Sequence, residues 1–234
     1  MPNTRYSHLL FDADNTLFDF DAAEAQSLRT VMEHIDFPMD RQNFNLYHHI
    51  NKKCWSDFEK GILAQEDIQI TRFTRFLERL KSDADPVEIG ALYLKGLATC
   101  TDLVYGAVDM LNRCRESGYE MVVITNGLKE VQRPHFEHTG LTEYFSHIIV
   151  SDEIGASKPH TAFFDHTFKA IGHPPKDKVL IVGDGLSSDI KGGMKYGVDT
   201  CWFNKRKMED LPKGFKPTYK IDKLEELEHI LKNA

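Results

Sequence analysis

Residues 9–17 read Leu-Leu-Phe-Asp-Ala-Asp-Asn-Thr-Leu, an apolar run that ends in two aspartates spaced two residues apart. The run has the length and composition of a buried β-strand, which we expect over residues 8–11. A strand that ends in a carboxylate and enters an Asp-Asn turn projects that carboxylate beyond the edge of the sheet. Ligands bind at the carboxyl ends of parallel strands, so Asp12 and Asp14 are candidate site residues.

Two carboxylates at this spacing can perform chemistry that one cannot. One can act as a nucleophile while the other transfers protons. Two like charges so close also favour a bound divalent cation, which keeps both groups ionised. The Asp-x-Asp pattern is also common in solvated turns, so the interpretation needs support from the rest of the chain.

Hydrophobic periodicity divides the remaining chain into two regions. Residues 22–101 repeat apolar side chains at helical spacing, which predicts three or four helices, with a stop at Gly61 and a start at Pro86. We expect Asp21 to cap the first of these helices together with Glu24. After Gly106 the pattern changes to alternating strands and helices. The expected strands cover residues 119–124, 148–150, 179–182, 200–203 and 219–221.

These patterns predict an α/β protein in which a Rossmann-like, doubly wound parallel sheet carries a smaller all-helical domain inserted after the first strand. We expect the sheet domain to comprise residues 1–18 and 102–234, and the helical domain residues 19–101. We also expect a helix over residues 128–139 that Pro134 kinks or delays, a loop up to Ser157, and a helix from Asp189 to Tyr196.

Composition limits the classes of partner. The net charge of −7 argues against a nucleic-acid polymer or an anionic membrane, although a small anion can still bind locally. The four cysteines are scattered and form no C-x-x-C pair, which fits a reducing cytoplasm. The first apolar run is broken by Asp12 and no run approaches the ~20 residues of a membrane span, so we expect neither a signal peptide nor a membrane helix.

Three further loops that follow expected strands carry polar groups. Thr125 and Asn126 offer a hydroxyl and amides, Lys158 a cation, and Asp184 and Asp189 further carboxylates. Taken singly, each has an ordinary explanation as a helix start, a surface lysine, a turn or a cap. Taken together, hydrogen-bond donors and a lysine suit phosphoryl oxygens, and clustered carboxylates suit Mg²⁺. Enzymes that move phosphoryl groups need both.

With these motifs the chain, from about Tyr6 to Asn204, resembles the haloacid dehalogenase-like hydrolase superfamily. The matching motifs are Asp12-Ala13-Asp14-Asn15-Thr16, Thr125, Lys158, and Gly183-Asp184 with Asp189. Within the superfamily it is similar to the pyrimidine 5′-nucleotidase branch. The stretches that carry this finer similarity are residues 51–55, 172–175 and 199–204.

The resemblance implies a role for each carboxylate. Asp12 would attack phosphorus to form an aspartyl-phosphate, and Asp14 would protonate the leaving group and then activate water. Mg²⁺ would be bound by the side chains of Asp12 and Asp184 and the backbone carbonyl of Asp14, with Asp189 near the metal. The dehalogenases of the superfamily lack the second aspartate and need no metal, so Asp14 favours phosphate chemistry.

The resemblance also implies how substrate is bound. Thr125, the amide of Asn126 and Lys158 would bind the phosphoryl oxygens, and the helical insert would act as a cap that excludes water. Candidate contacts to the leaving group are Phe18, Phe20, Asn51, Lys52, Trp55 and Phe58. Trp55 could stack on a nucleoside base, or it could belong to the core of the insert. His135 and His138 lack a third metal ligand, so we interpret them as surface residues.

We therefore predict a cytoplasmic, Mg²⁺-dependent phosphomonoesterase. Its expected substrate is a nucleoside 5′-monophosphate, with a preference for pyrimidines. A sugar phosphomutase or a phosphosugar phosphatase would share every core residue. A non-catalytic phosphate-binding regulatory protein is the alternative from another class, although no catalytic carboxylate is missing.

Overall fold

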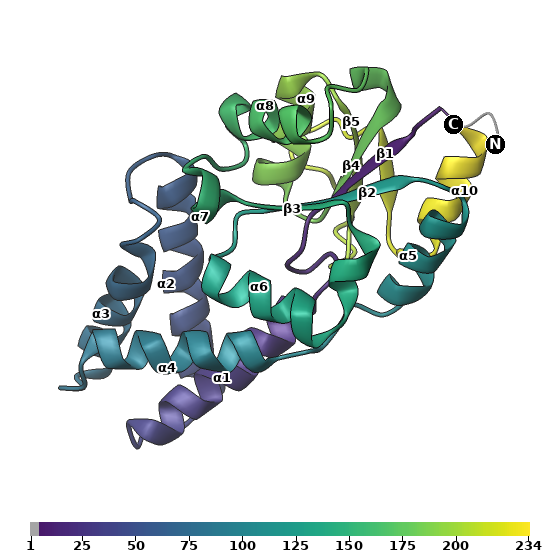
Figure 1. Cartoon of the computed structure of the whole chain (residues 1–234). Coiled ribbons are helices and arrows are strands. Elements are labelled where there is room, and N and C mark those ends of the chain that lie inside the picture. Colours follow the sequence, from purple (N-terminus) through teal and green to yellow (C-terminus); the bar gives the residue numbers. More distant parts are fainter. Residues whose placement is uncertain (1–4) are drawn as a thin grey trace. The chain divides into compact units, whose positions relative to one another are not determined.

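A computed structural model of the chain describes residues 5–234 and divides it into two compact units (Figure 1). The first unit contains the chain up to Asp19, Asp102–Lys129 and Phe136–Ala234, and the second contains Phe20–Thr101 and Glu130–His135. This division differs from the expected one in placing Asp19 in the first unit and residues 130–135 in the second. Each unit has a hydrophobic core of its own.

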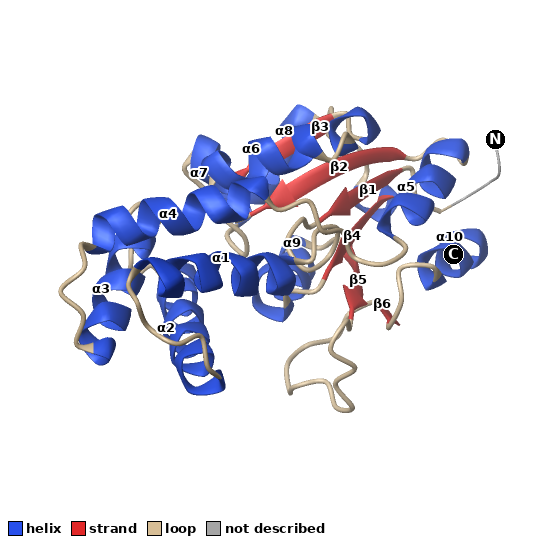
Figure 2. Cartoon of the chain, turned by 90° about the horizontal axis from the view of Figure 1, so that it is seen from below, coloured by secondary structure: helices blue, strands red, loops and turns tan. Residues whose placement is uncertain are grey.

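The first unit is built on a parallel sheet, which confirms the predicted α/β fold. Among the described residues, six strands lie in the order β3-β2-β1-β4-β5-β6, and all neighbouring pairs are parallel (Figure 2). The strands are β1 (His8–Phe11), β2 (Glu120–Thr125), β3 (His147–Val150), β4 (Val179–Gly183), β5 (Asp199–Phe203) and β6 (Tyr219–Ile221). With β1 at the centre, the loops that follow β1, β2 and β4 leave the sheet side by side.

Both faces of the sheet are buried, which explains why its strands read as continuous apolar runs. On one face, Leu9 and Phe11 pack with residues of α5 (Ala107–Glu116) and α10 (Glu226–Asn233). On the other face, Leu10 packs with phenylalanines of α8 (Thr161–Ala170). Because side chains alternate along β1, this one strand contributes to the hydrophobic clusters on both faces of the sheet.

Helix α6 (Lys129–His138) includes Pro134, as expected. Two other connections differ in detail from the expectations. A short helix, α7 (Ser151–Ile154), occupies part of the expected loop before Ser157. After β4 the chain forms a π-helical turn, Leu186–Ile190, before α9 (Lys191–Tyr196), so Asp189 does not begin a regular helix. Short 3₁₀ turns cover Leu141–Tyr144 and Lys176–Lys178.

The second unit is helical. Residues 20–101, all of them described, form α1 (Phe20–His34), α2 (Arg41–Glu59), α3 (Ile68–Leu80) and α4 (Pro86–Thr99). Helix α4 begins at Pro86 as predicted, and the Asp85 carboxylate accepts the backbone N–H of Val87. The predicted cap of α1 is wrong, because the helix begins at Phe20 and Asp21 lies in its first turn.

The core of the second unit includes part of α6. Val131 lies in the same core as Tyr47, Phe73 and Tyr93, and the buried His135 ring donates from Nε2 to the Leu97 carbonyl. The interpretation of His135 as a surface residue was therefore wrong, whereas His138 is exposed. The hydrophobic pattern of α6 gave no sign that one face serves the second unit.

Candidate active site

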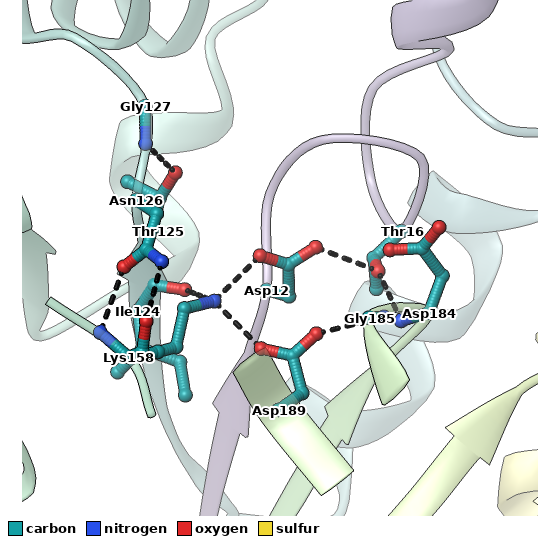
Figure 3. A network of polar contacts seen from close by, with 10 residues as sticks. All are labelled: Asp12, Thr16, Ile124, Thr125, Asn126, Gly127, Lys158, Asp184, Gly185 and Asp189. Atoms are coloured by element: carbon teal, nitrogen blue, oxygen red, sulfur yellow. Dashed lines mark hydrogen bonds and ion pairs between the residues drawn. The ribbon is translucent and has the colours of Figure 1, made fainter. Parts of the chain in front are cut away.

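The candidate site lies at the carboxyl ends of the central strands of the first unit (Figure 3). Asp12 directly follows β1, and its N–H still donates to the Val182 carbonyl at 2.9 Å, so the sheet ladder fixes its backbone. Asp184 directly follows β4, and Thr125 is the last residue of β2. The geometry thus brings together residues separated by up to 172 positions in the sequence.

Lys158 is the buried cation of the site. Its ammonium donates at 2.7 Å to each of three oxygens, Asp12 Oδ1, Asp189 Oδ1 and the Ile124 carbonyl, and its side chain is 1% exposed. Burial alone would lower the pKa of Lys158, but the charges of Asp12 and Asp189 and the hydrogen bonds to them raise it above its usual range. Lys158 is therefore a permanent positive charge held against Asp12.

Asp12, Asp184 and Asp189 form a carboxylate cluster. Each offers one oxygen that lies within 4.8 Å of the other two. Burial, followed by the negative charges of Asp12 and Asp189, raises the pKa of Asp184 well above its usual value. Burial and the charge of Asp12 likewise raise the pKa of Asp189 to about 7. A divalent cation would relieve this concentration of charge, and carboxylate oxygens are the ligands that Mg²⁺ prefers, so the donor set fits that ion.

Two glycines allow Asp189 to turn inward. The Gly185 N–H donates to Asp189 Oδ2 at 3.0 Å, and a Cβ atom on Gly183 would collide with the same carboxylate. The Gly183-Asp184-Gly185 sequence is therefore needed for the close approach of this carboxylate to the backbone, beyond its role as a turn.

Thr16 and Trp202 support the cluster, although the sequence motifs imply no role for either residue. The Thr16 hydroxyl donates to Asp12 Oδ2 at 3.0 Å and accepts the Asp184 N–H at 3.2 Å, so it joins two of the three acidic residues. The Trp202 indole N–H donates to the Asp184 carbonyl at 3.1 Å. Thr16 lies four residues after Asp12 in the stretch 9–17, and this proximity was the sequence signal that could have indicated its contact with Asp12. No local pattern pointed to the partner of Trp202.

The loop after β2 lies beside Lys158. The buried Thr125 hydroxyl accepts the Gly127 N–H at 3.0 Å and keeps its own proton for donation. The Asn126 side chain pairs with both backbone groups of Lys158, donating to its carbonyl at 2.8 Å and accepting its N–H at 2.9 Å. Its side-chain amide is therefore engaged, which leaves the predicted phosphate contact of Asn126 to its backbone amide.

Asp14 lies in the turn after Asp12 and is half-buried. The turn is closed by a parallel bridge between Asp14 and Phe18 and by a 2.8 Å hydrogen bond from the Asn15 N–H to the Phe18 carbonyl. The side chain of Asp14 is not part of the carboxylate cluster of Asp12, which leaves its expected metal contact to the backbone carbonyl.

Two of the expected leaving-group contacts are buried. Phe18 is 2% exposed in the core of the first unit, where its ring packs edge-on against Phe136 with centroids 4.9 Å apart. Asn51 is buried in the second unit, where it donates to Glu24 at 2.7 Å and accepts from Arg72 at 3.1 Å. Both side chains are engaged within their own units, and their contact with the leaving group stays a prediction.

The other leaving-group candidates retain some exposure. Trp55 and Phe58 are half-buried and pack edge-on with ring centroids 5.8 Å apart. Phe20, like Trp55 and Phe58, packs half-buried against the core of the second unit, and Lys52 is exposed. Both interpretations of Trp55 are compatible with this position, because one edge of the ring packs while the residue still has accessible surface.

The chain belongs to the haloacid dehalogenase-like hydrolase family, whose sequence profile matches residues 9–203. It is therefore a hydrolase, as the motifs predict. Its relatives include YfnB of Bacillus subtilis, a protein named as a HAD-hydrolase, which is 36% identical over 97% of this chain and 96% of its own. A crystal structure of YfnB bound to magnesium, which reveals interdomain movement, matches with a TM-score of 0.90 over 97% of this chain and 99% of that one.

Two further relatives are pyrimidine 5′-nucleotidases. YjjG of Escherichia coli is 34% identical over 97% of this chain and 98% of its own. PynA of Streptococcus pneumoniae is 31% identical over 95% of this chain and 93% of its own. These matches confirm the predicted resemblance to the pyrimidine 5′-nucleotidase branch.

Proposed function

We propose that this hydrolase is a Mg²⁺-dependent phosphomonoesterase that acts on nucleoside 5′-monophosphates, preferentially pyrimidines, through an aspartyl-phosphate. The observation that carries the proposal is the junction at Asp12. There, one carboxylate oxygen contacts the buried Lys158 ammonium at 2.7 Å, and the carboxylate lies in a cluster with Asp184 and Asp189. Phosphoryl transfer needs such opposed charges around one nucleophile.

The mechanism assigns the chemistry to the two aspartates of the first motif. Asp12 attacks phosphorus in line with the leaving oxygen, and the phosphoryl group is transferred to its carboxylate. Asp14 donates a proton to the leaving alkoxide and then accepts one from the water that hydrolyses the aspartyl-phosphate. Thr16 orients Asp12 for the attack through its 3.0 Å hydrogen bond.

The remaining residues bind the phosphoryl group. The Thr125 hydroxyl and the Asn126 backbone amide donate to its oxygens, and the Lys158 ammonium is already adjacent because it contacts Asp12. Asp12, Asp184 and Asp189, with the carbonyl of Asp14, would hold Mg²⁺, which when bound neutralises charge on the phosphoryl oxygens. The fit of the donor set supports the metal, as does the magnesium in the structure of YfnB.

The substrate class is supported by the relatives and by the helical unit. Two relatives over 30% identical across nearly the whole chain are pyrimidine 5′-nucleotidases. We propose that the second unit is a cap that moves relative to the sheet unit, as the interdomain movement of YfnB suggests. Its half-buried or exposed aromatic and basic residues Phe20, Lys52, Trp55 and Phe58 are our candidates for contacting the nucleoside.

We also propose a cytoplasmic location. In the described part of the chain, the four cysteines are buried and none forms a disulfide, which fits a reducing compartment. None of the described helices combines the length and the apolar character that crossing a membrane requires.

A phosphate-release screen tests the function directly. Purified protein with Mg²⁺ is offered nucleoside monophosphates, sugar phosphates and amino-acid phosphates, and inorganic phosphate is measured with and without EDTA. We expect release that is fastest with pyrimidine monophosphates, is lost in EDTA and returns when excess Mg²⁺ is added. If pyrimidine monophosphates are not among the best substrates, the substrate assignment is wrong although the phosphatase assignment stands.

Two outcomes of the same screen identify the alternatives. Interconversion of sugar phosphates that requires a bisphosphate activator, with no phosphate released, would show a phosphomutase. Binding of phosphate esters without turnover would show a regulatory protein. Turnover that persists in EDTA would contradict the metal site.

A further inference from the structure

Lys205 lies outside the family motifs quoted above but contacts the turn that carries Asp14. It follows β5, and its ammonium donates at 3.0 Å to the side-chain oxygen of Asn15 and at 2.8 Å to the carboxylate of Asp19. We propose that Lys205 is a positioning residue that fixes the orientation of Asp14 for proton transfer. This inference rests on the proposed phosphatase function, in which Asp14 is the acid and base.

The turn needs such support because its backbone is unusual. Asn15, the residue next to Asp14, has a φ of 62°, which lies in the left-handed region. Asparagine tolerates this conformation better than most residues, and a hydrogen bond to its side chain stabilises it further. Lys205 binds Asn15, near the start of the turn, and Asp19, which directly follows Phe18 at its end. One ammonium therefore links the two ends of the turn.

Lys205 itself extends from a fixed point of the sheet unit. The preceding residue, Asn204, is 2% exposed, and its backbone N–H donates to the Ile221 carbonyl at 2.8 Å. Its side chain donates to the Asp222 carboxylate at 3.0 Å and accepts the Met208 N–H at 2.9 Å. The lysine therefore connects a rigid strand end to the catalytic turn, which is the arrangement expected of a positioning residue.

Lys205 also restrains the point where the chain leaves the first unit. Asp19 is the last residue of that unit before the helices begin, and its N–H donates to the carbonyl of Asp102, where the chain returns, at 2.9 Å. By holding the Asp19 carboxylate, Lys205 ties this junction to the same ammonium that contacts Asn15, next to Asp14. Proton transfer depends steeply on such geometry.

The test uses the leaving group as a reporter of Asp14. An alkoxide leaving group, as in a nucleoside monophosphate, needs a proton from Asp14, whereas p-nitrophenolate does not. In Lys205→Met we expect kcat/KM to fall about tenfold for the nucleoside monophosphate, part of the ~10²–10⁴-fold that acid–base catalysis supplies, but less than about threefold for p-nitrophenyl phosphate. Across a series of aryl phosphates, kcat/KM should depend more steeply on leaving-group pKa than in the wild type.

Three variants complete the experiment. Lys205→Arg keeps the charge and should restore the wild-type dependence, and Asp14→Asn should show the full steepening. Lys213→Met, at an exposed lysine of the same loop, should behave as the wild type. Thermal unfolding of each variant identifies any that fail to fold.

The outcomes separate the two proposals. An active wild type with an unchanged leaving-group dependence in a folded Lys205→Met overturns the positioning role alone, as does an equal loss on every substrate. A wild type that releases phosphate from no phosphomonoester overturns both the positioning role and the proposed function.

Discussion

The two units each bury a charged cluster, and the clusters differ in how well they are satisfied. In the first unit, the Lys158 ammonium has three oxygen partners at 2.7 Å. In the second, the Arg72 guanidinium is 2% exposed and reaches Glu24 only through Asn51, and its Nε and Nη2 atoms have no hydrogen-bond partner among the described residues. Its guanidinium lies over the ring of Tyr93, 4.5 Å from the centroid.

The difference follows from where the charges originate. The groups around Lys158 come from loops at the ends of parallel strands, which can aim several side chains at one point beyond the sheet. Arg72 lies on α3, and the groups around it come from α1, α2 and α4, so their contacts run between helices. We therefore expect a catalytic role for the Lys158 cluster, which lies at the carboxyl ends of the strands, and a packing role for the Arg72 cluster.

The largest expected effect comes from removing the nucleophile. Asp12→Asn should lower the rate of phosphate release by at least about three orders of magnitude, because an amide cannot form the aspartyl-phosphate. The rate with a pyrimidine monophosphate and Mg²⁺ measures it, and circular dichroism checks that the variant is folded. A variant with near-normal turnover would refute the nucleophile assignment and remove the functional contrast between the Lys158 and Arg72 clusters.

Removing the cation of the first cluster should affect both activity and stability. Lys158→Met leaves Asp12 and Asp189 buried side by side without their counter-charge, which should cost about 3–5 kcal/mol of unfolding free energy as well as turnover. Mg²⁺ should then raise the unfolding temperature of the variant more than that of the wild type. Lys195→Met, at an exposed lysine, is the matched control. If Mg²⁺ raised the unfolding temperatures of Lys158→Met and the wild type equally, Lys158 and Mg²⁺ would not act on the same carboxylates.

Removing the cation of the second cluster should affect stability alone. Arg72→Met should lower the free energy of unfolding by about 3 kcal/mol, because Glu24 stays buried with less compensation. The double variant Glu24→Gln/Arg72→Met should lose less than the sum of the single variants. The kcat for p-nitrophenyl phosphate should stay within about threefold of the wild type, since a packing cluster contributes little to transition-state stabilisation. A loss of kcat comparable to that of Lys158→Met would show that the second cluster is catalytic.

The smallest effect is expected from Trp202, which supports the expected metal ligand Asp184 through a hydrogen bond. Trp202→Phe keeps most of the ring but removes the indole N–H that donates to the Asp184 carbonyl at 3.1 Å. Supporting contacts of this kind contribute about tenfold to metal affinity, so the Mg²⁺ concentration for half-maximal activity should rise by about that factor while KM is unchanged. A higher KM at saturating Mg²⁺ would place Trp202 with the substrate instead.

Much of the sheet unit could be predicted because its signals are local. The apolar run that ends at Asp12 marked β1 at its observed bounds, and the same logic located β6. The site motifs could be assembled because parallel strands share one carboxyl edge, a rule that needs only the order of strands along the chain. Lys158 next to Asp12 is the outcome of that rule.

What could not be predicted depends on partners chosen in three dimensions. Nothing near Asn51 in the sequence indicates that Glu24 and Arg72 will engage it, and nothing near Trp202 points to Asp184. The inward turn of Asp189 needs a π-helical turn, which no hydrophobic period encodes. The expected cap at Asp21 was wrong because α1 begins at Phe20.

The division of α6 has a consequence for transplanting the helical unit. Residues 130–135 belong to the second unit although they lie outside its contiguous sequence. Val131 fills its core, and His135 satisfies the Leu97 carbonyl near the end of α4. Excising residues 20–101 and grafting them onto another scaffold would therefore leave a cavity at the position of Val131. It would also remove one of two donors to the Leu97 carbonyl, which keeps the Cys100 N–H at 3.0 Å. A working chimera would have to carry residues 130–135 along with the graft, or the new host would have to supply an equivalent helix face.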